Sequence, residues 1–415
     1  MIDINDINYS YSHEELNLSF RKEKYTHGFQ KICIHWGYIL LQGFISSFSF
    51  LQRNYYSKTG KFDYIFLSFI GNDERALSPI AKKMGVSSKS FHLKDLPLRR
   101  TWFYAMIYSP IVFFKYLKYS GYLKKAYANE FMYFCRAYGY YIEAKKILKQ
   151  LEAKFLIVAN DHTYSRRAFF RAAQSLNIKT AYVQHASISE NFPPLEYDYA
   201  FLDGQESLDK YMANDKLCLS KVFLTGSPRF DIIKEIKKNE NENNNSKIRL
   251  GIAINMVDTL EKIQYLIDNI QKATNNIQIT FRPHPAMDKY FWSNFAINNN
   301  CIYSASKVEN PFDFISNNDI FIAGETSFHL DVALTGKTSY YYNFSNEDSL
   351  DHYGYLKNGL IKELSGNFTE LNDTSIGIVN PREREELIQY YVANYETSDW
   401  GKSAELISKI LECKE

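Results

Sequence analysis

Short apolar runs separated by polar stretches recur along the chain, and they predict buried strands alternating with helices. In the N-terminal half the runs predicted as strands cover 62–71, 88–93, 154–161, 179–186, 197–204 and 221–231. Nearly continuous apolar runs of this length are typical of parallel strands covered on both faces. A loop and a short helix ending at Gly85 are predicted after the first run. Residues 101–150 predict long helices rich in Tyr, Phe and Lys, and "SRRAFFRAAQSLN" predicts another helix.

The pattern breaks at 234–247, which has no apolar residue after Ile236, and then restarts. The helix predicted over 259–273 places Leu260, Ile263, Ile267 and Ile270 on one face. Strands are predicted within 248–255, 276–285, 318–327 and 337–344, with helices over 329–336, 381–396 and 403–414.

This rhythm indicates an α/β protein with two Rossmann-like, doubly wound domains that face a cleft. A chain of 415 residues also exceeds the usual size of one core. We expect an acceptor-binding domain over 1–233, a linker over 234–247, and a nucleotide-donor-binding domain over 248–415. The last helix belongs either to the second domain or packs back on the first.

Composition limits the kinds of binding partner and the cellular compartment that we expect. The formal net charge of +2 does not favour nucleic acid, and the five widely spaced cysteines predict neither a disulfide framework nor a metal site. The N-terminus is polar and acidic, so we expect no signal peptide. The most apolar stretches, 36–51 and 101–125, are too interrupted to predict a membrane span. We therefore expect a cytoplasmic protein.

Two groups of polar residues follow predicted strands in the first domain. "ANDHTYSRR" places Asp161 and His162 past a strand and Arg166 at a helix start, where a phosphate or carboxylate would be favoured; Asp161 or Thr163 capping the helix is the alternative. His185 stands at the end of "AYVQH" as either a general base, a phosphate ligand or a structural histidine.

The turn "GSPRFD" precedes the predicted linker. Its backbone N–H groups, with Ser227 and Arg229, suit an anion, so we expect Ser227 and Arg229 to bind the donor. Alternatively, Arg229 pairs with Asp231 and fixes the domain junction.

Two further groups follow strands of the second domain. In "FRPHP" the prolines end a strand, which leaves Arg282 and His284 at its carboxyl edge, where ligands bind in open α/β sheets. In "GETSFHLD" the hydroxyls and free N–H groups at a helix start suit a phosphate, and a plain helix cap is the alternative. The residues concerned are Gly324, Glu325, Thr326 and Ser327, with Asp331 one helical turn beyond to accept from ribose hydroxyls.

The order "QHA", "GSPRFD", "RPHP", "GETS" resembles that of GT-B-type transferases of bacterial surface polymers over about 154–345. One such group is the CMP-sialic acid and CMP-Kdo glycosyltransferases, and the other is the CDP-glycerol and CDP-ribitol phosphotransferases. Ala186 stands where the phosphotransferases have Gly, and Glu325–Thr326–Ser327 stands where a serine pair is expected.

The resemblance implies a role for each candidate. His284 and Arg282 would hold the donor phosphate with Thr326 and Ser327, and Asp331 would bind the ribose. His185 or Asp161 would be the base. The acceptor residues would be His162, Arg166 and Asp203, the last in a "DG" pair similar to an acidic-Gly motif of sialyltransferases.

The implied activity is transfer of a sugar from a cytidine-nucleotide donor to a hydroxyl of a capsule, lipooligosaccharide or other surface glycan. The alternatives are CDP-alditol phosphotransfer and an epimerase-like reaction on a sugar nucleotide. We expect no cofactor and no metal, because a His, an Arg, hydroxyls and a helix start can stabilise the leaving phosphate.

The aromatic, lysine-bearing stretch 101–125 has two interpretations. It either packs as amphipathic core helices or rests on the inner face of the cytoplasmic membrane, where lipid-linked acceptors are displayed.

Overall fold

The protein is represented by a computed structural model that divides into two compact units. Unit 1 comprises Met1–Leu202, Leu208–Arg229 and Ala404–Glu415, and unit 2 comprises Asp203–Ser207 and Phe230–Ser403. The structure describes residues 2–16, 28–48, 60–68, 71–96, 98–160, 162–188, 190–213, 218–235, 247–345, 351–364, 366, 368, 371 and 381–413. Asp161 and most of the predicted linker 234–247 lie outside these ranges.

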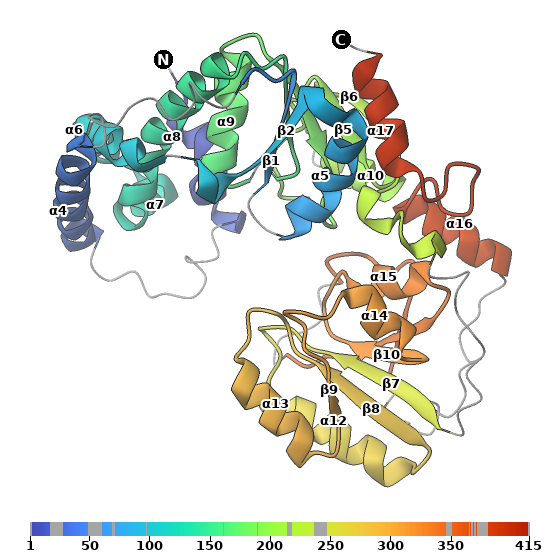
Figure 1. The fold of residues 1–415 in the computed structure, drawn as a ribbon. Coiled ribbons are helices and arrows are strands. Elements are labelled where there is room, and N and C mark those ends of the chain that lie inside the picture. Colours follow the sequence, from blue (N-terminus) through green and yellow to red (C-terminus); the bar gives the residue numbers. More distant parts are fainter. Residues whose placement is uncertain are drawn as a thin grey trace. The chain divides into compact units, whose positions relative to one another are not determined.

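Unit 1 contains a sheet of six parallel strands in the order β2-β1-β3-β4-β5-β6 (Figure 1). The strands are β1 (Tyr64–Ser68), β2 (Ser88–His92), β3 (Phe155–Val158), β4 (Lys179–Val183), β5 (Tyr199–Leu202) and β6 (Lys221–Leu224). The chain runs outward in one direction through β2 and in the other through β3 to β6. The order therefore reverses between β1 and β3, which is a topological switch point.

Helices cover both faces of this sheet. On one face Tyr64 and Phe66 pack with α5 (Gly71–Met84) and α17 (Ser403–Glu412). On the other, Ile65 and Leu67 pack with α8 (Phe131–Gln150) and α9 (Tyr164–Gln174). Alternate residues of one strand thus enter two cores, which explains why the strand sequences are apolar throughout.

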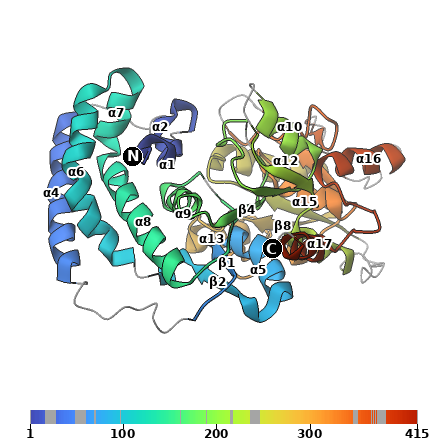
Figure 2. The same ribbon diagram turned by 90° about the horizontal axis from the view of Figure 1, so that it is seen from above.

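A layer of helices extends unit 1 beyond the sheet, where α4 (Gly28–Ser47), α6 (Thr101–Lys118), α7 (Gly121–Asn129) and α8 lie side by side (Figure 2). The helices share an aromatic core that includes Tyr127, Phe131 and Phe134. They approach closely at Gly139 of α8, where a Cβ would lie 2.1 Å from the carbonyl oxygen of Thr101. Within the described ranges no helix is long and apolar enough to cross a membrane.

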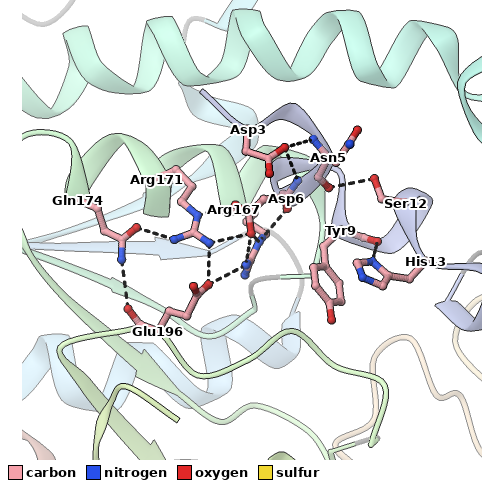
Figure 3. Close-up of polar contacts among 10 residues, drawn as sticks. All are labelled: Asp3, Asn5, Asp6, Tyr9, Ser12, His13, Arg167, Arg171, Gln174 and Glu196. Atoms are coloured by element: carbon pink, nitrogen blue, oxygen red, sulfur yellow. Dashed lines mark hydrogen bonds and ion pairs between the residues drawn. The ribbon is translucent and has the colours of Figure 1, made fainter. Parts of the chain in front are cut away.

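The N-terminal helix α1 (Ile4–Ile7), which precedes α2 (Tyr9–Ser12), is held to α9 by an ion-pair network (Figure 3). Asp6 Oδ1 accepts from Arg167 Nη2 at 2.5 Å and from Arg171 Nη2 at 2.7 Å. Glu196 Oε2 accepts from the same two nitrogens at 3.0 and 2.6 Å. Arg167 is 1% exposed, so its charge depends on these two carboxylates.

Unit 2 also contains six parallel strands, in the order β12-β11-β10-β7-β8-β9 (Figure 1). They are β7 (Ile248–Ala253), β8 (Ile277–Arg282), β9 (Ile302–Tyr303), β10 (Ile320–Ala323), β11 (Thr338–Tyr341) and β12 (Lys362–Glu363). Counted along the chain from β7, this is the 3-2-1-4-5-6 order of dinucleotide-binding sheets, with the reversal between β7 and β10.

Helices again cover both faces of this second sheet. Ile320 and Ile322 pack with α12 (Leu260–Ala273) and α13 (Lys289–Asn298). Phe321 packs with α14 (Pro311–Ser316), α15 (Phe328–Leu334) and α16 (Pro381–Tyr391). On α12 the predicted apolar face is buried except at Leu260, which is exposed in the first turn. The prediction of two doubly wound α/β units is confirmed.

We predict that Asp6→Asn destabilises the fold by roughly 3 kcal/mol, because it leaves the buried Arg167 short of a countercharge. Denaturant unfolding at pH 7 measures this. As a control, Glu152→Gln breaks the exposed Lys61–Glu152 pair and should cost less than about 1 kcal/mol.

The ion pairs of Asp6 also predict that the stability of the fold depends on pH in the acid range. Burial raises the pKa of Asp6, but the bonds and charges of Arg171 and Arg167 outweigh it and hold the pKa below its ordinary value. The stability that Asp6 contributes is therefore present above about pH 4 and is lost as pH falls through the lower folded value. Equal acid sensitivity of the wild type and Asp6→Asn would contradict this assignment.

Candidate active site

The first group of candidate residues lies at the switch point of the unit 1 sheet. Asp73 stands in the first turn of α5, after β1. Asn160 follows β3 and His185 follows β4. Because parallel strands end on the same edge, these residues from distant parts of the sequence come together there.

His185 is the central member of this group, which we call the histidine cluster: Asp73, Asn160, His162, Arg166, His185 and Arg229. His185 is 5% exposed, and its Nε2 lies 4.0 Å from Asp73 Oδ1 and 3.5 Å from Asn160 Nδ2. Burial lowers its pKa to about 4, against the opposing effect of Asp73 and with the help of Arg229 and Arg166. His185 is therefore neutral at pH 7, and a neutral imidazole can accept a proton.

Asp73 is fully buried and forms an ion pair with Arg166, whose Nη2 lies 2.8 Å from Asp73 Oδ2. Arg166 Nη1 also donates to the hydroxyl of Thr163 at 2.9 Å. Thr163 occupies the N-cap position of α9 but makes no capping bond with its side chain, so its hydroxyl serves Arg166 instead. This corrects the alternative in which Thr163 caps the helix.

His162 joins the cluster through Asn160, whose Nδ2 lies 3.3 Å from His162 Nε2. Its ring centroid is 6.4 Å from that of His185 and 4.9 Å from that of Phe192. Burial, followed by the charges of His185 and Arg166, lowers the pKa of His162 to about 3. A neutral His162 can bind an acceptor through hydrogen bonds and not through charge.

The turn 226–231 contributes to the same cluster. Arg229 belongs to unit 1, and its charge acts on His185. Ser227 is fully buried after Gly226, which has the positive φ of 66° that this turn needs. Asp231 accepts from the backbone N–H of Ser403 at 2.9 Å.

Asp203, predicted to bind the acceptor, groups with unit 2. It is 2% exposed, and its carbonyl oxygen accepts from the backbone N–H of Ala393 at 2.8 Å. The structure thus brings His162 and Arg166 together in unit 1 and assigns Asp203 to the other unit.

The second group of candidates follows β8 and β10 of unit 2. His284 is exposed, and its Nδ1 accepts from the backbone N–H of Ala286 at 3.2 Å. Partial burial lowers its pKa, so at pH 7 the ring is neutral with its proton on Nε2. That N–H can donate to a phosphate oxygen.

Arg282 has a different role from its neighbour in the loop. Its Nη1 donates to Ser304 Oγ at 2.7 Å and to Glu309 Oε2 at 3.1 Å, and its Nη2 donates to the Glu309 carbonyl at 2.9 Å. The guanidinium also stacks over Phe314 at 5.2 Å. Arg282 therefore fixes the base of the loop that presents His284.

The turn after β10 is organised by a buried histidine. His329 Nε2 donates to the Gly324 carbonyl at 2.9 Å, and its Nδ1 accepts from Ser339 Oγ at 2.6 Å. Thr326 Oγ1 accepts from the backbone N–H of Phe328 at 3.3 Å. Ser327 is the N-cap residue of α15 and makes no capping bond with its side chain.

Three carboxyl groups lie at or near this turn. Asp258 Oδ1 would be 3.2 Å from a Cβ on Gly324, and burial raises the Asp258 pKa to about 6 despite the N–H of Asn255. Burial also raises the pKa of Glu325. Asp331 stands half-buried in the first turn of α15. Gly324 therefore allows the Asp258 carboxyl to approach the strand end closely.

Sequence reasoning missed Asp73, Asn160, Asp258 and His329. Asp73, Asn160 and Asp258 lie within a few residues of the ends of β1, β3 and β7, which was the available signal. His329 gives no such signal, because its role depends on Ser339. Within the described part of the chain, no group of three or more His, Cys, Asp or Glu residues could hold a metal ion.

Comparison with known proteins shows likeness in structure only. No protein-family profile matches the sequence, and no curated protein matches it significantly. UDP-GlcNAc 2-epimerase from Neisseria meningitidis bound to UDP-GlcNAc superposes with a TM-score of 0.53 at 12% identity over 84% of this chain and 99% of that chain. The wall teichoic acid polymerase TagF superposes with a TM-score of 0.51 at 14% identity over 94% and 98%. The chain shares their fold, which confirms two Rossmann-like units of the GT-B class.

We predict that Arg229→Gln raises the pKa of His185 above its value of about 4, because the Arg229 charge opposes protonation of the ring. Histidine ring chemical shifts followed by NMR against pH measure this. Arg382→Gln, an exposed change on α16, should leave the His185 titration unaltered. An unchanged His185 titration in Arg229→Gln would remove Arg229 from the histidine cluster.

Proposed function

We propose that the chain is a transferase that moves a sugar from a cytidine-nucleotide donor, of CMP-sialic acid or CMP-Kdo type, to a hydroxyl of a bacterial surface glycan. The observation that carries this is a neutral, buried histidine beside a paired carboxylate at a sheet switch point. Ligands bind at such edges, and a neutral histidine suits proton removal from an alcohol.

The acceptor would react at the histidine cluster. His185 Nε2 takes the proton of the acceptor hydroxyl, and Asp73, 4.0 Å away, stabilises the imidazolium that forms. The acceptor oxygen bonds to the anomeric carbon as the bond from that carbon to the phosphate oxygen breaks. Asn160 and His162 hydrogen-bond the acceptor, and Asp161 is the rival base.

The donor would bind at the carboxyl edge of the unit 2 sheet. The Nε2–H of His284 and the hydroxyls of Thr326 and Ser327 donate to the phosphate that leaves with the nucleotide. Asp331 accepts from the ribose. Arg282 acts indirectly, because Glu309 and Ser304 occupy its guanidinium.

The second candidate is a CDP-alditol phosphotransferase. It is favoured by the position of Arg229, because a cation beside the base would stabilise charge on a phosphoryl group during its transfer. TagF, a wall teichoic acid polymerase of the same fold, makes this reaction class a natural comparison. An epimerase-like reaction on a UDP-sugar is the third outcome that the tests separate.

Nucleotide preference separates these candidates. We predict that CMP binds more tightly than CDP, and that both bind at least tenfold more tightly than UDP or GDP, in calorimetric titrations of the full chain. Tighter binding of CDP than CMP would select the phosphotransferase. A preference for UDP would overturn both cytidine proposals.

Two histidine variants separate binding from chemistry. His284→Gln should weaken nucleotide binding at least tenfold, because its donor to the phosphate is lost. His185→Gln should leave nucleotide binding within twofold and lower kcat roughly 10²- to 10⁴-fold. The exposed His13→Gln serves as the control and should change neither. Normal turnover of His185→Gln would assign the base elsewhere, with Asp161 next to be replaced.

A further inference from the structure

Unit 1 carries an apolar surface on its outer helices. Ile34 and Phe44 of α4 and Phe114 of α6 are 71%, 62% and 61% exposed. The other exposed large apolar side chains of α4, α6 and the residue after α4 are Phe29, Tyr38, Leu40, Leu41, Ile45, Phe48, Ile107, Ile111 and Leu117. We call this set the α4–α6 face; the two helices lie side by side at one end of unit 1 (Figure 2).

The charged side chains of α4, α6 and α7 all have one sign. The helices α4, α6 and α7 contain no Asp or Glu, and their charged residues are Lys31, Lys115, Lys118, Lys124 and Lys125. An exposed apolar face with a basic margin fits a membrane surface of anionic lipids. Each basic residue near such a surface contributes about 1 kcal/mol to the free energy of binding. A water-soluble protein partner would not require a margin of one sign.

A cavity of about 970 Å³ adjoins this face. Ile45 and Phe48 belong both to the α4–α6 face and to the cavity lining, so the cavity opens beside the face. Its lining also includes Thr163 and Arg166 at the start of α9. Since Arg166 binds Asp73, the cavity extends from the apolar face to the histidine cluster.

The cavity is suited to an anion. Its described lining contains four basic side chains and no acidic one: Lys94, Arg99, Arg136 and Arg166. Arg136 is held by stacking at 4.3 Å over Trp102 and by a 3.0 Å bond from its Nη2 to Tyr140 Oη. Its Nε is buried and has no hydrogen-bond partner among the described residues. A guanidinium held in place in this way is pre-organised to bind an anionic oxygen through its remaining N–H groups.

We propose that this cavity binds the anionic head group of a lipid phosphate or diphosphate, whose chains lie in the bilayer beneath the α4–α6 face. The inference rests on the proposed transferase function in one respect, since it makes this lipid the carrier of the acceptor. Arg136, Lys94 and Arg99 bind the phosphate, and the head group leads toward Arg166 and His185.

Vesicle flotation with the full chain tests the face. Phosphatidylcholine vesicles containing one fifth phosphatidylglycerol should bind the protein at least tenfold more than pure phosphatidylcholine. Phe44→Glu and Phe114→Glu should each abolish most binding, whereas Tyr290→Glu, an exposed aromatic on α13, should not. Unchanged binding of both face variants would overturn the membrane assignment. A dimer that Phe44→Glu turns into a monomer would also overturn it, because a second copy would then cover the face.

A long-chain isoprenyl phosphate at low mole fraction in phosphatidylcholine vesicles tests the cavity. The isoprenyl phosphate should make the wild-type protein bind phosphatidylcholine vesicles strongly. In Arg136→Gln this gain should be at least tenfold smaller, while binding of the variant to vesicles that contain phosphatidylglycerol stays within twofold of wild type. Lys94→Gln with Arg99→Gln provides a second variant at the exposed rim, should Arg136→Gln fold poorly. The exposed Arg382→Gln is the matched control.

Two outcomes would overturn the cavity assignment. One is equal response of wild type and both cavity variants to the isoprenyl phosphate. The other is full competition by millimolar inorganic phosphate or by phosphatidylglycerol, which would make the site a general anion surface. Cytidine nucleotide titrations run in parallel distinguish this failure from failure of the proposed function, because nucleotide binding depends on unit 2.

Discussion

The ion pair between Arg166 and Asp73 is the contact on which the candidate base depends. Both side chains are buried, at 3% and 0% exposure, so neither charge is stable without the other. The pair ties α9 to α5 across the switch point between β1 and β3. It also restrains the carboxylate 4.0 Å from His185, where its charge partly offsets the lowering of the ring's pKa by burial.

Other parts of unit 1 support this arrangement. Asp6 and Glu196 neutralise Arg167, the residue after Arg166, and Arg171, one turn further along α9. Two of the three arginines of α9 therefore belong to a separate network. The same helix starts at the cavity that adjoins the α4–α6 face. The start of α9 therefore contributes both to the cationic cavity and to the histidine cluster, and the cavity lining includes residues of the α4–α6 face. This gives the proposed lipid carrier a route to the base.

The strand order could be expected only in outline from the sequence. Alternating apolar runs predicted parallel strands, and the end of β8 at Arg282 agrees with the prediction that the prolines of "FRPHP" end the strand. The two-residue strands β9 and β12 are too short to give a pattern. The helix α4 lacks amphipathic spacing because apolar residues occur on both its buried and its exposed faces.

Candidate site residues could be chosen from the sequence where polar residues follow a predicted strand end. His185, His284 and Thr326 were identified that way, whereas the partners that set their behaviour were not. These partnerships form only in the tertiary structure. They are the ion pair of Asp73 with Arg166, the contact of Glu309 with Arg282, and the effect of the Arg229 charge on His185. No local spacing encodes them, because each joins separate elements of the chain.

The pH dependence of kcat/KM with the best-binding donor tests the central claim most directly, because it reports the titration of the base in the free enzyme. If buried His185 is that base, kcat/KM stays level from pH 8 to about pH 5 and falls only as the ring protonates near its pKa of about 4. A fall centred near pH 6.5, the value of an ordinary exposed histidine, would contradict the account.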